Sequence, residues 1–178
     1  AFSVFYALSG YVLTFSWNIM WMDCIYLLPL IMLGLVKLVR DSHGLLFCIT
    51  LSIALFSNFY VAFFVCIFLV LYFPLCYFKY NSIRPFKTLL KKIAMFAGYS
   101  LLAAGLAAII LLPTFFALKL TSAADDAFPS KVEHYYDYFD YITRHFTGAS
   151  PSIREGMPNI YCGIIILILI PIYFLSKN

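Results

Sequence analysis

A short polar stretch near the start of the chain carries the side chains best suited to chemistry. SWNIMWMD, residues 16–23, places the amide of Asn18 and the carboxylate of Asp23 inside about forty otherwise apolar residues. A carboxylate there can act as a general base, a metal ligand or a group that orients a substrate hydroxyl. The structural alternative is that Asp23 caps one end of a helix and neutralises the N–H groups that are exposed there.

Polar residues elsewhere could complete a site with this stretch. Ionisable groups at membrane depth normally face a cavity or a partner, and an arginine suits a phosphate or pyrophosphate. Arg154 could bind a phosphate in this way, although an arginine on a loop can equally be solvated. We predict Asp23 as the catalytic residue. The predicted substrate-binding residues are Trp17, Asn18, Trp21, Asn58, Tyr60, Arg154, Glu155, Asn159 and Tyr161.

Composition and charge clustering predict a helical membrane protein. Of the residues, 64% are hydrophobic and 11% are charged, against about 25% charged in an average soluble domain. The charges are clustered, and the apolar runs between them approach the length of a membrane-spanning helix. The sequence therefore predicts an all-α, polytopic transmembrane helical bundle.

Six crossings can be drawn within a single transmembrane region covering residues 1–178. They span roughly residues 1–16, 23–40, 44–57, 59–78, 93–118 and 160–176. The first run opens in mid-helix without an initiator Met, which predicts a fragment of a longer protein. The crossings over 44–57 and 59–78 are short for about 30 Å of hydrocarbon. They form either a short hairpin or a pair with one re-entrant limb, and either arrangement leaves Asn58 at a turn where its amide needs a partner.

The distribution of Lys and Arg predicts the orientation. The stretch from Lys79 to Lys92 has five bases and no acid, whereas residues 119–155 have four bases and six acids. The positive-inside rule therefore predicts that residues 37–43, 79–92 and 177–178 are cytoplasmic. The same rule makes residues 119–159 an extracytoplasmic loop. Beside a membrane, the basic stretch is better explained by contact with anionic lipid than with nucleic acid.

The extracytoplasmic loop is predicted to contain a short amphipathic helix over about residues 131–146. Ser130 and Glu133 have the spacing of a capping box, apolar residues then recur at helical spacing, and Gly148 supplies a stop. This helix either lies in the membrane interface or covers a substrate cleft with its aromatic, acidic face. The sequence contains no nucleotide-binding motif and no cysteine or histidine spacing typical of a metal site.

Several motifs, in order along the chain, resemble the YfhO family of bacterial polytopic membrane proteins. They are ALSGYVLTFSWNIMWMD, LPLIMLGL, SNFYVAFFVCIFLVLYF, LPTFFALK and GMPNIYCG. The resemblance implies a GT-C-like glycosyltransferase architecture located in the bacterial cytoplasmic (plasma) membrane. Such enzymes transfer a sugar from a polyprenyl-phosphate donor to an acceptor outside that membrane, here a lipoteichoic acid or another cell-envelope polymer.

The resemblance also implies that the main acid, acting as base or metal ligand, lies in a first outer loop that precedes this fragment. A divalent metal enters only through that implication, so the cofactor is unknown. The expected partners are the lipid bilayer, the lipid-linked donor and the envelope acceptor, with no nucleic acid. Two alternatives stay open: a transporter or flippase of lipid-linked sugars, and a non-catalytic membrane scaffold.

Overall fold

The computed structural model describes residues 2–81, 86–121, 137–146, 148, 159–161 and 163–176. Over these ranges the regular structure is helical and includes no strand, which confirms the predicted all-α class. The chain divides into two compact units, residues 20–127 and residues 1–19 together with 128–178.

The unit formed by residues 20–127 is a bundle of apolar helices. They are α3 (Ile19–Asp41), α4 (Leu45–Ser57), α5 (Phe59–Tyr80), α6 (Phe86–Leu106) and α7 (Ala108–Leu118). Among the described helices, α3, α5 and α6 are long and apolar enough to cross a membrane, whereas α4 and α7 are shorter. The assignment of six crossings, which also needs the shorter helices, stays a prediction.

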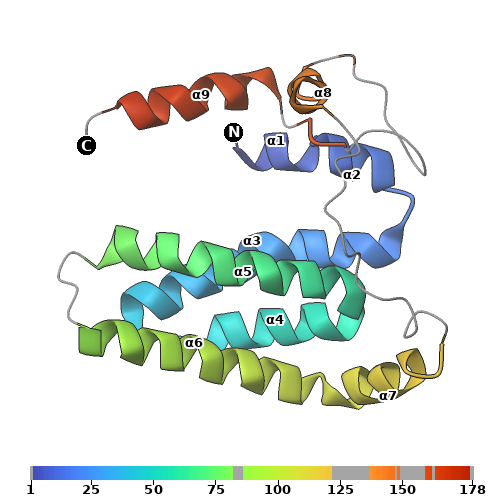
Figure 1. Ribbon diagram of the computed structural model, residues 1–178, viewed down its shortest axis with the longest axis vertical. Helices are drawn as coiled ribbons and strands as arrows, with labels where there is room; N and C mark the ends of the chain where they lie inside the picture. Colours follow the sequence, from blue (N-terminus) through green and yellow to red (C-terminus); the bar gives the residue numbers. More distant parts are fainter. Residues whose placement is uncertain are drawn as a thin grey trace. The chain divides into compact units, whose positions relative to one another are not determined.

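Helix α4 occupies the centre of this unit, between α5 and α6 (Figure 1). Aromatic rings join the three helices: Phe96 of α6 lies 5.7 Å from Phe47 of α4 and 4.9 Å from Phe73 of α5, between ring centroids. On its other side α4 touches α3 at Gly34, where an added Cβ atom would lie 2.6 Å from the backbone N and Cα of Phe47. The absence of a side chain at Gly34 therefore allows α3 and α4 to pack backbone to backbone.

The crossing predicted over 93–118 corresponds to two helices, because the chain leaves the helix at Ala107. This residue separates α6 from α7 and has φ −88° and ψ 1°. Pro113 lies inside α7 and does not interrupt it. Ala103 and Ala107 are fully or almost fully buried, so the chain changes direction where small side chains bring it closest to the core.

The cationic end of this unit, where α3 and α5 end and α6 begins, contains a buried lysine. Lys92 is only 6% exposed, although the sequence places it in a basic loop. Its Nζ donates to Ser42 Oγ at 2.7 Å and to the Leu38 carbonyl at 3.3 Å. Ser42 follows α3 with a positive φ of 61°. Lys92 thereby ties the start of α6 to the end of α3, where helix carbonyls favour a cation.

The second unit holds α1 (Phe2–Ala7), α2 (Gly10–Phe15), α8 (Tyr138–Thr143) and α9 (Ile164–Leu175). The predicted continuous span over 1–16 is interrupted between α1 and α2. The cause is Gly10, whose N–H donates to the Tyr161 carbonyl at 2.7 Å and so leaves the helical pattern. Helix α9 begins only after Gly163, because its φ of +98° is a conformation that glycine adopts without strain.

Helix α8 is shorter than the helix predicted over 131–146. Asp137 has extended backbone (φ −73°, ψ 154°) and forms a reciprocal capping box with Asp140, so α8 starts at Tyr138. The capping box predicted at Ser130 and Glu133 lies outside the described residues.

Candidate functional site

The turn between α4 and α5 consists of one residue, Asn58, which serves both helices. Its backbone N–H donates to the Ala54 carbonyl at 3.1 Å and so ends α4. Its side-chain Oδ1 accepts from the Val61 N–H at 3.0 Å and so caps α5. Its Nδ2 donates to the Met20 carbonyl of α3 at 3.2 Å. The amide of half-buried Asn58 is therefore hydrogen-bonded through both Oδ1 and Nδ2, and it links three helices.

Asp23 lies beside the same turn. It is exposed, in the second turn of α3, and it accepts a hydrogen bond from Ser57 Oγ at 3.4 Å. The next residue, Cys24, is fully buried, and its thiol faces the carbonyls of Ala54 and Asn58 at 3.5 and 3.6 Å. Buried Cys24 thus fixes the register of α3, and exposed Asp23 is held at the surface next to the turn.

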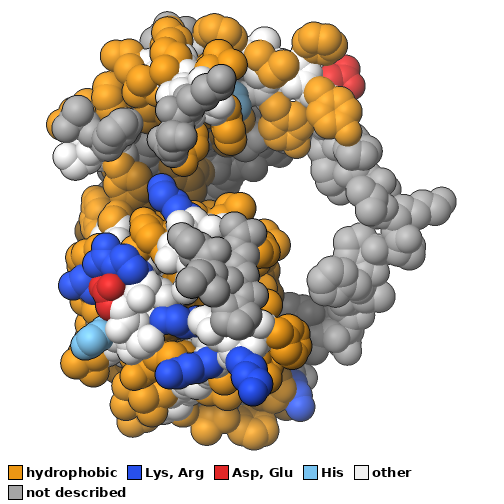
Figure 2. Space-filling model, turned by 90° about the vertical axis from the view of Figure 1, so that its left-hand side faces the viewer, with side chains coloured by type: hydrophobic (Ala, Val, Ile, Leu, Met, Phe, Trp, Pro, Cys, Tyr) orange, Lys and Arg blue, Asp and Glu red, His pale blue; other side chains and the backbone are white. Residues whose placement is uncertain are grey.

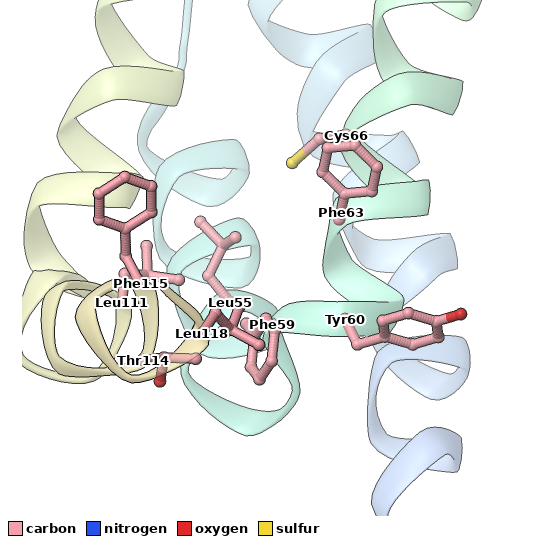
Figure 3. Close-up of a pocket in the computed structure, with 9 residues that line it drawn as sticks. All are labelled: Leu55, Phe59, Tyr60, Phe63, Cys66, Leu111, Thr114, Phe115 and Leu118. Atoms are coloured by element: carbon pink, nitrogen blue, oxygen red, sulfur yellow. The ribbon is translucent and has the colours of Figure 1, made fainter. Parts of the chain in front are cut away.

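An apolar pocket of about 520 Å³ opens on the other side of this turn. In Figure 3, Leu111 and Phe115 of α7 face Phe63 and Cys66 of α5, while the Tyr60 hydroxyl points away from α7. The full lining is Leu55, Phe59, Tyr60, Phe63, Cys66, Leu111, Thr114, Phe115 and Leu118. Its size and its largely aromatic and aliphatic walls are typical of pockets that bind small apolar groups.

Other predicted site residues lie in the second unit. Trp17 is 63% exposed, and Asn18 is half-buried with its N–H donating to the Phe15 carbonyl at 2.8 Å. Asn159 and Tyr161 are half-buried just before α9, and the Tyr161 carbonyl fixes the start of α2. Arg154 and Glu155 lie outside the described residues.

The structure therefore brings Asp23 and Asn58 to one turn, with Tyr60 at its edge. Trp21 is half-buried in the first turn of α3. That all the predicted site residues lie together in one site stays a prediction. The site residues predicted from the sequence do not include Ser57 or the pocket residues on α7. Ser57 precedes Asn58 in the predicted turn, which was a usable signal, whereas Thr114 and Phe115 lie in a largely apolar run that gives none.

A family model described as bacterial membrane protein YfhO matches residues 1–178, the whole sequence. The chain belongs to the YfhO family. The match confirms the resemblance seen in the sequence motifs, and together with the apolar helices it makes this YfhO-family chain a membrane protein. No curated protein and no solved structure matches it.

Replacing Asn58 by alanine is expected to destabilise this YfhO-family protein. Loss of a helix N-cap costs about 0.5–2 kcal/mol, and the variant also loses the hydrogen bond to Met20. Asn58→Asp is the matched control, because it keeps an acceptor for Val61 N–H and places a negative charge at the start of α5. Thermal unfolding in detergent should rank wild type above Asn58→Asp and Asn58→Asp above Asn58→Ala. Equal unfolding temperatures for wild type and Asn58→Ala would contradict the capping role.

Proposed function

We propose that this protein is a membrane glycosyltransferase that moves a sugar from a polyprenyl-phosphate donor to a cell-envelope polymer. The observation that carries the proposal is that polar and apolar binding surfaces meet at one turn. Ser57 Oγ connects the turn to Asp23, and Asn58 Nδ2 connects it to the Met20 carbonyl of the same helix. Phe59 and Tyr60 begin the wall of the apolar pocket. A lipid-linked sugar has the same two parts, a polar head and an isoprenoid tail.

The proposed reaction assigns one step to each surface. The pocket takes the first part of the isoprenoid tail, so that the sugar lies at the polar side of the turn. An acceptor hydroxyl then attacks the anomeric carbon, its proton passes to the Asp23 carboxylate, and the bond from that carbon to the phosphate oxygen breaks. Polyprenyl phosphate leaves with both electrons of that bond. Arg154 is the proposed cation for its phosphate.

The proposed orientation follows the positive-inside rule. It places the turn at Asn58 and residues 119–159 on the outer face of the bacterial plasma membrane. Residues 37–43, 79–92 and 177–178 are then cytoplasmic. Lipoteichoic acid and other wall polymers are accessible from the outer face, which makes them the proposed acceptors.

Filling the pocket tests the tail assignment. Leu111→Trp places a larger side chain on the pocket wall, whereas Leu112→Trp makes the same change one residue away, at a position that is 57% exposed and absent from the lining. Membranes containing each variant are supplied with a radiolabelled polyprenyl-phosphate sugar, and label in envelope polymer is measured. Leu111→Trp should reduce transfer about tenfold or more, mainly by raising KM for the donor, with Leu112→Trp close to wild type. Equal transfer by the two variants would contradict the pocket's role.

The same assay separates glycosyl transfer from transport. The interruptions at Ala107 and between α1 and α2 favour a transporter as the second candidate, because broken helices are common in transporter sites. A transporter moves the labelled donor across the membrane and leaves the sugar–phosphate bond intact. Movement of unchanged donor to the opposite face of the membrane, with no labelled polymer in membranes that contain the protein, would therefore support transport and overturn the transferase proposal.

A further inference from the structure

We propose that the cationic end of the unit formed by residues 20–127 binds the headgroup of an anionic phospholipid. Figure 2 shows Lys and Arg side chains gathered on this face, with acidic surface beside some of them. They come from the end of α3, the end of α5 and the start of α6. The residues are Lys37, Arg40, Lys79, Lys87, Lys91 and Lys92.

The charges at this end are not balanced within the described part of the chain. The acidic residue at this end is Asp41, and its two carboxylate oxygens each accept from Arg40 at 2.8 Å. Lys92 donates to neutral oxygens, and Lys79 Nζ lies 5.8 Å from the centre of the Tyr80 ring. The carboxylate is therefore already engaged, and the neighbouring ammonium groups still favour an anion.

Helix α6 presents two of these cations as a pair. Lys87 and Lys91 are exposed and four residues apart, so they lie on one face of the helix, where like charges repel. The helix is held in place by Lys92, whose hydrogen bonds to the end of α3 are made in a site that is only 6% exposed. A phosphate between Lys87 and Lys91 would relieve their repulsion on a scaffold that is already ordered.

The apolar surroundings favour a lipid over a free phosphate. Phe78, Phe86 and Leu90, which border the cations, are 53%, 75% and 56% exposed. A phospholipid offers a phosphate to the lysines and acyl chains to these side chains at the same time. Clusters of Lys and Arg next to membrane-spanning helices attract anionic lipids in this way.

The test measures dissociation constants for phosphatidylglycerol and phosphatidylcholine by native mass spectrometry of the purified protein in detergent. Neutralising one lysine should weaken phosphatidylglycerol binding about fivefold, so the double variant Lys87→Gln, Lys91→Gln should lose roughly 30-fold. Lys119→Gln is the matched control, because Lys119 follows α7 and lies 4.6 Å from the centre of the Phe115 ring, away from this cluster. It should bind like the wild type.

Three results would overturn the proposal. One is equal affinity of the wild type for phosphatidylglycerol and phosphatidylcholine. Another is phosphatidylglycerol binding by the double variant as tight as by Lys119→Gln, with all the proteins unfolding at similar temperatures. The last is competition by soluble glycerol phosphate at the same concentration as the lipid, which would identify a site for free phosphate. Because Lys87 and Lys91 are exposed, their replacement leaves the core intact and the comparison interpretable.

Discussion

An Asp23→Asn variant is expected to lose sugar transfer by roughly a hundredfold or more, the usual scale for removal of a general base, while folding as the wild type does. Asparagine has nearly the same shape as aspartate, and its Oδ1 can still accept the hydrogen bond from Ser57 that the structure shows at 3.4 Å. The amide cannot take the proton of an acceptor hydroxyl. The loss should therefore appear in kcat, with the KM for the donor little changed.

Two further variants separate proton transfer from positioning at this site. Ser57→Ala removes the hydrogen bond to Asp23 but keeps the carboxylate, so it should retain much more activity than Asp23→Asn. Asp23→Glu keeps a carboxylate and should recover part of the transfer. The readout is labelled envelope polymer per amount of protein in the membrane. Transfer at the wild-type rate by Asp23→Asn would show that Asp23 takes no proton and that another group accepts it.

Gly34→Ala should destabilise the bundle, with an effect set by the contact between α3 and α4. The added Cβ atom would lie 2.6 Å from backbone atoms of Phe47, and backbone atoms cannot rotate aside as a flexible side chain can. The two helices must separate, and overpacking of this kind typically costs about 1–3 kcal/mol. Thermal unfolding in detergent should show a clear fall in Tm.

Gly98→Ala is the matched control for this prediction. Gly98 is also inside a helix, α6, but a Cβ atom added there meets nothing within 4 Å. Both substitutions gain the same helix propensity, about 1 kcal/mol, so only the contact with Phe47 distinguishes them. Gly98→Ala should equal or exceed the wild-type Tm. A Gly34→Ala protein as stable as Gly98→Ala would mean that α3 and α4 are not packed at this point.

Most of the helical architecture was predictable because apolar runs and their interruptions are local properties of the sequence. The run over 59–78 and the turn at Asn58 correspond to α5 and its cap. The interruptions at Gly10 and Ala107 were not predictable, because each depends on a tertiary contact. Gly10 donates its N–H to Tyr161, which lies at the other end of the chain, and Ala107 is buried in the core.

The candidate site was predictable in its residue types but not in its pairings. Asp23 and Asn58 stand out in the sequence as polar residues in apolar surroundings. Nothing local indicates that Ser57 meets Asp23 across 34 residues, or that the Asn58 amide is used to link helices. Lys92 shows the same limit, since its neighbours in sequence predict an exposed basic loop and the fold buries it against α3.

The interruption at Ala107 means that the two walls of the apolar pocket are attached to the bundle in different ways. Helices α4 and α5 are connected by Asn58 alone, and the ends of both helices are hydrogen-bonded to it. Helix α7 carries the opposite wall and is attached through a single non-helical residue. Because Ala107 is almost fully buried, a larger side chain at this position would displace α7 and so change the width of the pocket.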